Sequence, residues 1–501
     1  MPVPDPDLAT ARQLKAAAAL LAALSPRVSE LGQLFAAAGH ELALVGGPVR
    51  DVFLGRTSGD LDLTTDAPPD RILEVVGNWA DQVWTIGIDF GTVGLRKGGL
   101  TFEITTYRSE SYARTSRKPV VSYGRSLTDD LSRRDFTVNA MAARLPGYQL
   151  VDPFGGLGDL RRGVLRTPAS PQDSFTDDPL RILRAARFAA QLGFRVASEV
   201  RAAMTELAGL LAPPKVSAER IEGELTKLLR SPLPGGPKTG IELLVDTGVA
   251  DQVLPEIPAL RLETDEHFRH KDVYHHSLTV LSQAIRLEPR YGLDSDLVLR
   301  LAALLHDIGK PRTRSRLPDG RVAFHNHELV GARMARKRLS ELRYGKDVVA
   351  DVSQLIELHL RFHGYGEGDW TDSAVRRYAT DAGPLLGRLH ALTRADCTTR
   401  NKAKALRLER AYDELEARIE ELAAQEELDR IRPDLDGNEI MTILGIPQGP
   451  LVGRAWSHLK ELRMDRGPLD HDTAVQELLR WAASEGLVVP PPDPTSAGSP
   501  D

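Results

Sequence analysis

One segment, residues 44–65 (LVGGPVRDVFLGRTSGDLDLTT), constrains the fold more than any other part of the sequence. Two aliphatic residues precede Gly46 and Gly47, a helix-like run follows, and a β-like stretch then carries Asp60 and Asp62. A glycine pair after a strand lets backbone N–H groups approach phosphate oxygens closely. Residues two apart on a strand point to the same face, so Asp60 and Asp62 can direct two carboxylates to one point. With a third carboxylate they would suit a Mg²⁺ ion that also holds a triphosphate, which predicts a nucleotidyl-transfer site.

The strand candidate TFEITTYR (residues 101–108) offers Glu103 as the third catalytic carboxylate. The alternative is that Glu103 lies on a solvated strand face. An Asp-x-Asp pair alone is also weak evidence, because any half-buried strand edge can carry two aspartates. The assignment therefore depends on the motifs that follow.

The pattern of the chain changes near residue 155. β-like runs alternate with helical runs from residue 41 to about residue 151, and helical periodicity dominates afterwards. A chain of 501 residues is too long for one ordinary domain. We therefore predict a multidomain α/β plus all-α protein, with a small mixed-sheet head followed by helical neck, body and tail. The expected parts are an N-terminal helical lead-in (1–35), a head (36–155), a helical neck (156–262), a His-rich domain (263–400), a helical tail (401–486) and a disordered end (487–501).

Charge and cysteine content limit the function classes. The net charge is -6, so an RNA contact would have to use local basic patches. Two segments qualify, residues 108–134 and 161–195, each with seven basic residues against three acidic ones. The single cysteine, Cys397, excludes an intrachain disulfide and fits a reducing compartment. With no apparent signal peptide and no apolar run long enough to span a bilayer, we expect a cytoplasmic protein without a membrane partner.

Two further clusters place arginines where a nucleotide could bind. In DLSRRDFTVNA (130–140), Arg134 belongs to an arginine pair flanked by aspartates, and guanidinium groups suit phosphate oxygens. The alternative is a structural ion-pair network. In DDPLRILRAARF (177–188), the residues that recur every three positions are Asp178, Arg181, Arg184 and Arg187. Such a row can accept from an exocyclic amine and donate to base acceptors, although an arginine row seen alone is usually a solvated helix face.

These motifs occur in a fixed order: GGPVRD…GDLDLTT, DLSRRDFTVNAMA, DPFGGLGDLRRGVLRT, DDPLRILRAARFA and VSAERIEGELTKLL. Over residues 44–229 the chain resembles the class II CCA-adding tRNA nucleotidyltransferases and their poly(A) polymerase relatives. The resemblance implies addition of CCA to the 3′ end of tRNA from CTP and ATP, in a head that holds two metals, a neck that reads the base, and a body and tail that grip tRNA. The roles it implies are Mg²⁺ binding by Asp60 and Asp62, triphosphate contacts by Gly46, Gly47 and Arg50, a nucleotide contact by Arg134, base pairing by Asp178 and Arg181, and completion of the pocket by Arg184 and Arg187.

The sequence departs from this family at one point. The glutamate that usually precedes the template aspartate is Asp177 here, which shortens a side chain next to the pocket without changing its charge. An A-adding enzyme, a CC-adding enzyme or a poly(A) polymerase would use the same template pair. The features that divide them lie in a loop near residues 109–125 and in the shape of body and tail.

Residues 267–396 hold a disproportionate share of the 13 histidines. His276 (VYHHSL), His306 and Asp307 (LLHDIGK), His327 (FHNHE), His359 (LIELHLRFH) and Asp396 (ADC) stand in recognisable contexts. Such a His/Asp mixture suits Mn²⁺, Fe, Ni²⁺ or Mg²⁺ better than a structural zinc site. A lone helical histidine is usually an ordinary core or surface residue. A His-Asp pair together with further histidines and a distal aspartate indicates a metal site instead.

This region resembles the HD phosphohydrolase superfamily. The resemblance implies a first metal shell of His276, His306, Asp307 and Asp396, second-metal ligands His327 and His359, and phosphomonoesterase or 2′,3′-cyclic phosphodiesterase activity. His275 could exchange roles with its neighbour, and some HD domains serve chiefly to bind tRNA.

Two other function classes remain open on the sequence alone. The chain could be a metal-dependent HD phosphohydrolase with a relic head, or a non-catalytic RNA-binding protein. Residues 426–486 carry no chemistry of their own, and by analogy they would support the tRNA elbow or body. The sequence leaves the oligomeric state open.

Overall fold

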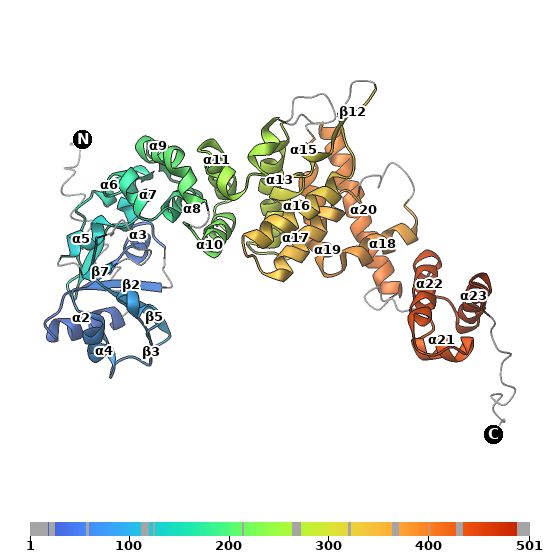
Figure 1. Cartoon of the computed structure of the whole chain (residues 1–501), viewed down its shortest axis with the longest axis horizontal. Helices are drawn as coiled ribbons and strands as arrows, with labels where there is room; N and C mark the ends of the chain where they lie inside the picture. Colours follow the sequence, from blue (N-terminus) through green and yellow to red (C-terminus); the bar gives the residue numbers. More distant parts are fainter. Residues whose placement is uncertain are drawn as a thin grey trace, which may run out of the picture. The chain divides into compact units, whose positions relative to one another are not determined.

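The computed structural model describes residue 19 and residues 26–56, 60–111, 120–123, 126–212, 215–262, 272–318, 322–362, 370–399, 401–426 and 434–487. The chain divides into two compact units, residues 1–258 and 259–501 (Figure 1). Most of the expected lead-in helix, most of the loop near residues 109–125 and nearly all of the expected disordered end lie outside the described residues. The last part of the lead-in forms helix α2 (Pro26–Ala37).

The first unit is built on a seven-stranded mixed sheet, as the sequence predicts. Strands β2 and β5 run parallel, whereas all other neighbouring strands of this sheet run antiparallel. In spatial order the strands are β3 (Gln82–Trp84), β4 (Thr92–Lys97), β5 (Leu100–Thr106), β2 (Asp60–Thr65), β1 (Leu42–Val45), β8 (Ala142–Leu145) and β9 (Gln149–Val151).

Helices cover both faces of this sheet. All four residues of β1 are buried, as expected for a strand whose two faces are both packed. On one face, Ala43 and Val45 share a buried cluster with Leu127 and Leu131 of α5 (Leu127–Ser132). Helices α2 and α4 (Pro69–Val76) pack against each other and against strands of the sheet (Figure 1). The sheet therefore forms a rigid base for the residues that emerge at its ends.

The helical part of the first unit begins with α6 (Gly156–Arg162) and α7 (Pro171–Asp177). Helix α8 (Leu180–Leu192) starts after Pro179, whose φ of -58° is already helical, and it ends at Gly193, whose φ of 72° is left-handed. Helices α9 (Ser198–Leu207), α10 (Ala218–Leu229), α11 (Gly236–Asp246) and α12 (Ala250–Val253) complete this part. Both α10 and α11 pack on α8, so α8 lies at the centre of the neck.

A buried polar chain joins the sheet to α8. The guanidinium of Arg50 donates to Asn139 Oδ1 at 2.6 Å, and the Asn139 amide donates to Asp135 Oδ1 at 2.9 Å. Arg184 of α8 donates to the other Asp135 oxygen at 2.5 and 2.8 Å. The Phe136 amide adds a further hydrogen bond to Asp135 at 2.8 Å. Three separate segments of the sequence thus meet at one buried carboxylate.

The second unit is helical. Its main helices are α13 (Val273–Leu287), α14 (Leu297–Leu305), α16 (His327–Glu341), α17 (Lys346–Leu358), α18 (Asp372–Ala382) and α19 (Leu386–Asp396). A small hairpin of β12 (Arg314–Arg316) and β13 (Val322–Phe324) precedes α16. The long helix α20 (Lys402–Glu426) packs on α19 and α18. Tyr412 of α20 donates to the Thr393 carbonyl at 2.7 Å, which joins this helix to the HD region rather than to the last three helices.

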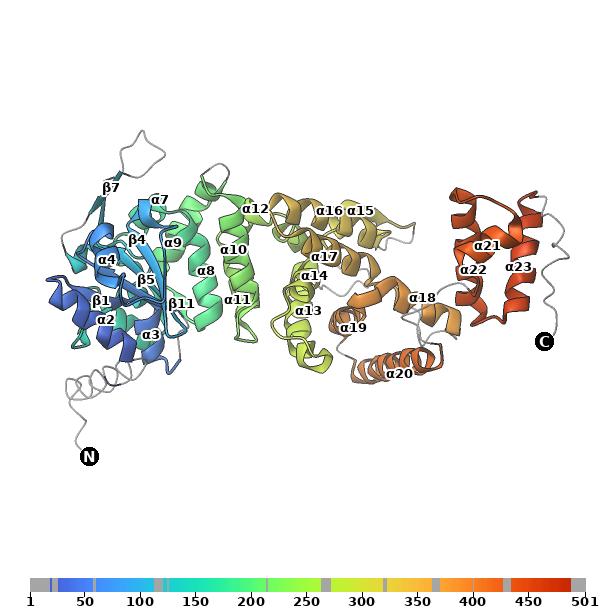
Figure 2. The same ribbon diagram turned by 90° about the horizontal axis from the view of Figure 1, so that it is seen from below.

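The last three helices form a bundle with its own core. They are α21 (Gly437–Leu444), α22 (Pro450–Arg466) and α23 (His471–Ser484), and Figure 2 shows them side by side. A capping box between Asp436 and Glu439 begins α21. Arg376 of α18 donates to the Met464 carbonyl at 3.0 Å, so the bundle is attached to the body by a buried contact. Within the described part of the chain, no helix combines the length and apolar character needed to cross a bilayer.

The buried carboxylate at the head–neck junction predicts a pH dependence of stability. Burial alone would raise the pKa of Asp135, but the Arg184 charge and the hydrogen bonds from Asn139, Arg184 and the Phe136 amide lower it to about 2. Because the folded pKa lies below the ordinary value of 3.8, the stabilisation is present above pH 4 and is lost as pH falls toward 2. We expect Asp135→Asn to remove roughly 2 kcal/mol of stability at neutral pH and less at pH 2, measured by urea unfolding.

The matched control is Asp246→Asn, because Asp246 forms an exposed ion pair with Arg201 at 3.2 Å. This variant should change the free energy of unfolding by less than about 1 kcal/mol at every pH. A difference between wild type and Asp135→Asn that stays constant from pH 2 to pH 6 would contradict the assignment.

Candidate active sites

The carboxylates of the head lie on adjacent central strands. Asp60 and Asp62 belong to β2, and Glu103 belongs to the parallel neighbour β5, directly opposite Asp62. Asp62 is half-buried and Glu103 is exposed, whereas Leu61 and Leu63 are buried on the other face. The side chain of Asp60 lies outside the described residues. The two described carboxylates thus share one face of β2 and β5, opposite to Leu61 and Leu63, and there they could reach a metal-bound triphosphate.

The Gly46–Gly47 loop lies at the same level of the sheet. Strand β1 runs antiparallel to β2 with Leu44 opposite Leu63, so the end of β1 is next to the start of β2. Gly46 has a φ of 73°, and a Cβ added there would lie only 3.0 Å from Arg134 Nη1. A larger residue would therefore be strained and would displace the Arg134 guanidinium.

The arginines expected at the triphosphate surround this loop. A Cβ on Gly47 would lie 3.8 Å from Arg50 Nη2, so Arg50 passes beside the loop before it reaches Asn139. Arg50 also pairs with Asp51 at 2.8 Å. Arg134 donates to Asp130 Oδ2 at 3.4 Å, a long contact that leaves the guanidinium one-quarter exposed. The structure thus brings two cations and the paired carboxylates to one end of the sheet.

The structure divides the expected base-reading row into two pairs. Asp178 and Arg181 are partly exposed at the start of α8, and each has a partner within the protein. Arg220 of α10 donates to Asp178 Oδ1 and Oδ2 at 3.1 and 3.2 Å. Arg181 donates to Ser174 Oγ at 2.9 Å and to the Arg133 carbonyl at 2.5 Å.

Arg184 and Arg187 contact carboxylates inside the neck, although the Arg184 side chain is still 32% exposed. Arg184 contacts Asp135, as described above, and lies 3.7 Å from Glu224. Arg187 lies 2.6 Å from Glu224, and both side chains are at least nine-tenths buried. Sequence reasoning missed four partners, which are Asp135, Asn139, Arg220 and Glu224. All four stand within the motifs that carry the resemblance, but nothing in their spacing says which residue each one contacts.

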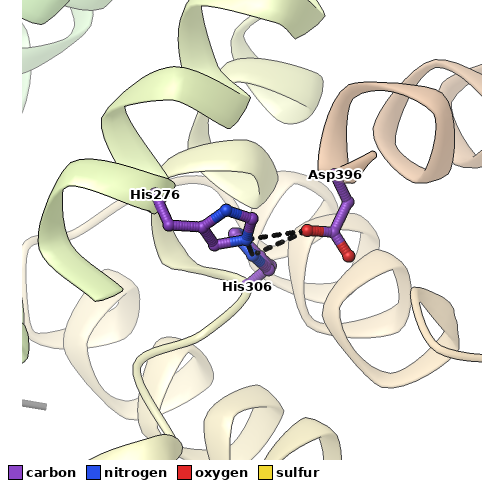
Figure 3. A group of neighbouring side chains, drawn as sticks. All are labelled: His276, His306 and Asp396. Atoms are coloured by element: carbon purple, nitrogen blue, oxygen red, sulfur yellow. Dashed lines mark hydrogen bonds and ion pairs between the residues drawn. The ribbon is translucent and has the colours of Figure 1, made fainter. Parts of the chain in front are cut away.

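The second site is a cluster of histidines and carboxylates in the HD region. Ligand atoms of His276, His306 and Asp396 lie within 4.8 Å of one another, and so do those of Asp307, His327 and His359. In Figure 3, His276 and Asp396 point toward each other from α13 and the end of α19, with Nε2 2.8 Å from Oδ1. Among the described residues, these are the two groups in which three or more potential ligand atoms lie this close together.

This grouping refines the expected ligand sets. Asp307 lies between the two groups, because its Oδ2 is 3.2 Å from His306 Nε2 and its Oδ1 is 3.3 Å from His327 Nε2. Its carboxylate could therefore bridge two metals. His275 does not join the cluster: its side chain is 69% exposed and its nearest carboxylate is Asp272 at 3.9 Å.

Backbone carbonyls fix the histidine tautomers. The Nδ1–H groups of His306, His327 and His359 donate to the carbonyls of residues three positions earlier, at 2.9, 2.8 and 2.6 Å. A carbonyl can only accept, so each Nδ1 carries the proton and each Nε2 of a neutral ring presents a lone pair. Since all three Nε2 atoms lie in the two candidate groups, the rings are oriented as metal ligands require.

The electrostatics fit divalent metals. Burial, together with the nearby His306, lowers the pKa of His359 to about 3, so this ring is neutral, as a metal ligand must be. The buried Nε2 of His359 also has no hydrogen-bond partner, which is costly unless an ion is bound. Burial would raise the pKa values of Asp307 and Asp396, but the neighbouring histidines lower both, so both carboxylates are ionised. The donor set of imidazoles and carboxylates suits Mn²⁺, Fe, Ni²⁺ or Mg²⁺.

Three protein-family models match this chain. The poly A polymerase head domain matches residues 42–166, a probable RNA and SrmB-binding site of polymerase A matches residues 193–260, and the HD domain matches residues 273–401. The first two lie in the first compact unit, apart from the last residues of the second model, and the third lies in the second unit.

Curated relatives match this chain over different lengths. An A-adding tRNA nucleotidyltransferase of Deinococcus radiodurans is 36% identical over 431 residues, which are 84% of this chain and 91% of that protein. A CCA-adding enzyme of Levilactobacillus brevis is 43% identical over 213 residues, and one of a Geobacillus species is 41% identical over 212 residues. Those matches cover 42% of this chain and 51% and 50% of the two CCA-adding enzymes, so the chain spans about half the length of these relatives.

Solved structures share the fold. The Bacillus stearothermophilus CCA-adding enzyme in complex with CTP aligns with a TM-score of 0.65 at 24% identity, covering 92% of this chain and 98% of that one. The Thermotoga maritima CCA-adding enzyme complexed with tRNA aligns with a TM-score of 0.58 at 19% identity, covering 91% and 96%. Together with the relative that is matched over nine-tenths of its length, these findings assign the chain to the tRNA nucleotidyltransferase family, within the group that combines a poly A polymerase head with an HD domain.

Proposed function

We propose that this chain adds CCA to the 3′ end of tRNA from CTP and ATP. One observation carries the proposal: a chain of hydrogen bonds from Arg50 to Arg184 links the helix Gly47–Phe53, which follows β1, to the helix that bears Arg181. The residues that would hold the triphosphate and those that would read the base are thereby fixed relative to each other. Relatives named CCA-adding enzymes are 41% and 43% identical over 42% of the chain, which supports the proposal.

Base selection would be performed by Asp178 and Arg181. The Asp178 carboxylate can accept a hydrogen bond from the exocyclic amine of cytosine or adenine, and Arg181 can donate to a ring nitrogen or carbonyl. Uracil and guanine present a carbonyl oxygen where the amine would be, which a carboxylate cannot bind. The same two side chains can therefore serve both CTP and ATP while they exclude the other two nucleotides.

The transfer step would take place on the open face of β2 and β5. Mg²⁺ held by Asp60 and Asp62 would neutralise the triphosphate charge and make the 3′ hydroxyl more reactive. Arg134, which lies beside Gly46, would donate to phosphate oxygens, and Glu103 would lie next to Asp62 on the neighbouring strand. The tRNA 3′ oxygen forms a bond to the α-phosphorus, the bond from that phosphorus to the bridging oxygen breaks, and pyrophosphate leaves.

Addition of the terminal A alone is the second candidate. It is favoured by the relative matched over 91% of its length, which is named an A-adding enzyme, whereas the CCA-adding relatives are matched over about half of theirs. Asp178 and Arg181 are compatible with both activities, because the terminal adenine would form the same hydrogen bonds with them in either enzyme.

A tRNA transcript without its CCA end distinguishes the two candidates. For a CCA-adding enzyme we expect two C residues from CTP alone and the complete CCA end from CTP with ATP. Incorporation of A only on a tRNA that already ends in CC would support the A-adding activity instead. A long A tract on generic RNA would indicate a poly(A) polymerase.

Replacement of the head carboxylates tests the site itself. We expect Asp60→Ala with Asp62→Ala to lower incorporation by at least about 100-fold, because loss of metal ligands exceeds the 10–100-fold effect of their outer partners. The matched control is Asp70→Ala, since Asp70 is an exposed carboxylate in the first turn of α4 in the same head. Equal activity of the double variant and the control would refute the assignment.

We also infer that the HD cluster binds Mn²⁺, Fe, Ni²⁺ or Mg²⁺ and hydrolyses phosphate esters such as 2′,3′-cyclic phosphates. The candidate ligands are the six residues of the two groups, and the unpartnered Nε2 of His359 supports a bound ion. A metal held there would polarise the phosphate and favour attack by water. Lys310, whose Nζ lies 2.9 Å from Asp307 Oδ2, is placed to neutralise charge beside the cluster.

Metal content tests this site independently of nucleotide addition. We expect His359→Gln to lower bound Mn²⁺ or Ni²⁺, measured by mass spectrometry of the metal-loaded protein, and to abolish hydrolysis of 2′,3′-cyclic AMP. His275→Gln is the control, because His275 is an exposed neighbour outside the cluster. Equal metal content in both variants would contradict the ligand assignment. Retained hydrolysis in Asp60→Ala with Asp62→Ala would show that the two sites act separately.

A further inference from the structure

Two charged residues of α10, Arg220 and Glu224, contact the segment that contains α8. Arg220 and Glu224 are four positions apart on α10, so both can face the same neighbouring helix. Glu224 contacts Arg187 at 2.6 Å, and Arg220 donates to both oxygens of Asp178. Complementary charges therefore meet at two places: α10 contacts Arg187 on α8 and Asp178 just before α8.

These two contacts differ sharply in exposure. The side chains of Glu224 and Arg187 are only 6% and 10% exposed, whereas those of Arg220 and Asp178 are 51% and 30% exposed. A buried ion pair is strongly destabilising to break, because one charge is left without a partner. An exposed pair opens at little cost, because water replaces the partner. The Glu224–Arg187 contact thus stabilises the packing of α10 on α8. The Arg220–Asp178 contact can open and be replaced by another hydrogen-bond donor.

The outer contact occupies the acceptor that base reading requires. Arg220 Nη2 lies 3.1 and 3.2 Å from the two Asp178 oxygens, and the Leu180 amide donates to Oδ1 at 3.3 Å. An exocyclic amine of cytosine or adenine is an N–H donor of the same kind as a guanidinium. It would need one of the same oxygens at a similar distance.

We propose that Arg220 is a positioning residue that stands in for the base amine at Asp178, so that an incoming cytosine or adenine must displace it. This inference rests on the proposed function and identifies the protein group against which the nucleotide competes. In the absence of nucleotide, Arg220 keeps the Asp178 carboxylate paired. After each addition the pair re-forms, which helps to release the base from Asp178 before the next nucleotide binds.

The competition predicts tighter binding when Arg220 is removed. We expect Arg220→Ala to lower the Kd and the KM for CTP and for ATP by about two- to fivefold, the range available from an exposed ion pair. UTP affinity should not tighten, because uracil brings no amine to Asp178. The value of kcat should not rise, since no contact to the reacting phosphate changes.

The readouts are equilibrium binding of CTP, ATP and UTP to the full chain with bound tRNA, and steady-state incorporation. Arg201→Ala is the matched control, because Arg201 is equally exposed and pairs with Asp246 on a different helix pair. Arg220→Lys, which keeps a cation but lacks the guanidinium fork, should fall between wild type and Arg220→Ala. The gain in affinity should also shrink as salt rises, because salt screens the pair that is removed.

A double-mutant cycle separates this role from a structural one. In the Asp178→Asn background, Arg220→Ala should leave CTP affinity unchanged, because the competing ion pair no longer exists. A raised or unchanged Kd for CTP in Arg220→Ala alone would overturn the proposal, and so would an equal gain for UTP. A wild-type protein that binds CTP but incorporates none would instead refute the proposed function, while the comparison of binding would still decide the role of Arg220.

Discussion

The buried carboxylate of Asp135 is the charge on which the first unit depends. A carboxylate removed from water is costly unless charged and neutral donors surround it, and here Arg184, Asn139 and a main-chain amide do so. Since Asn139 also accepts from Arg50, the Asn139–Asp135 pair joins the helix Gly47–Phe53 of the head to α8 of the neck. The sheet and the helical neck are thereby joined by hydrogen bonds at a buried position.

The two candidate sites use the same residue types in opposite settings. In the head, Asp62 is half-buried and Glu103 exposed, on a face where a large, highly charged substrate could enter. In the HD region, His306, Asp307 and His359 are almost completely buried, and their orientation is set by backbone carbonyls. The first arrangement suits ions that arrive with the nucleotide, and the second suits ions that stay with the protein.

The sequence was sufficient to predict the mixed sheet and the succession of helical parts. Strand alternation and the order of motifs depend on local chemistry, which a sequence displays directly. The six residues that meet in the HD cluster could also be predicted, because the sequence contains the motifs of the HD phosphohydrolases. It could not predict the pairing of Arg220 with Asp178 or of Glu224 with Arg187, because those contacts depend on how two helices are rotated against each other. It could not decide between His275 and His276 either, since adjacent helical positions differ by about 100° in direction.

Helix α20 shows that the segment matched by the HD family model does not contain every helix that contacts the HD cluster's supporting residues. The HD model ends at residue 401, one position before α20 begins. Yet Glu416 and Asp413 of α20 bind the guanidinium of Arg394 at 2.9 and 2.7 Å, two residues before Asp396. The last carboxylate of the cluster is therefore placed by a helix beyond the recognised boundary. Gene fusions that transplant an HD module of this kind would keep a working metal centre only if they carried that helix along.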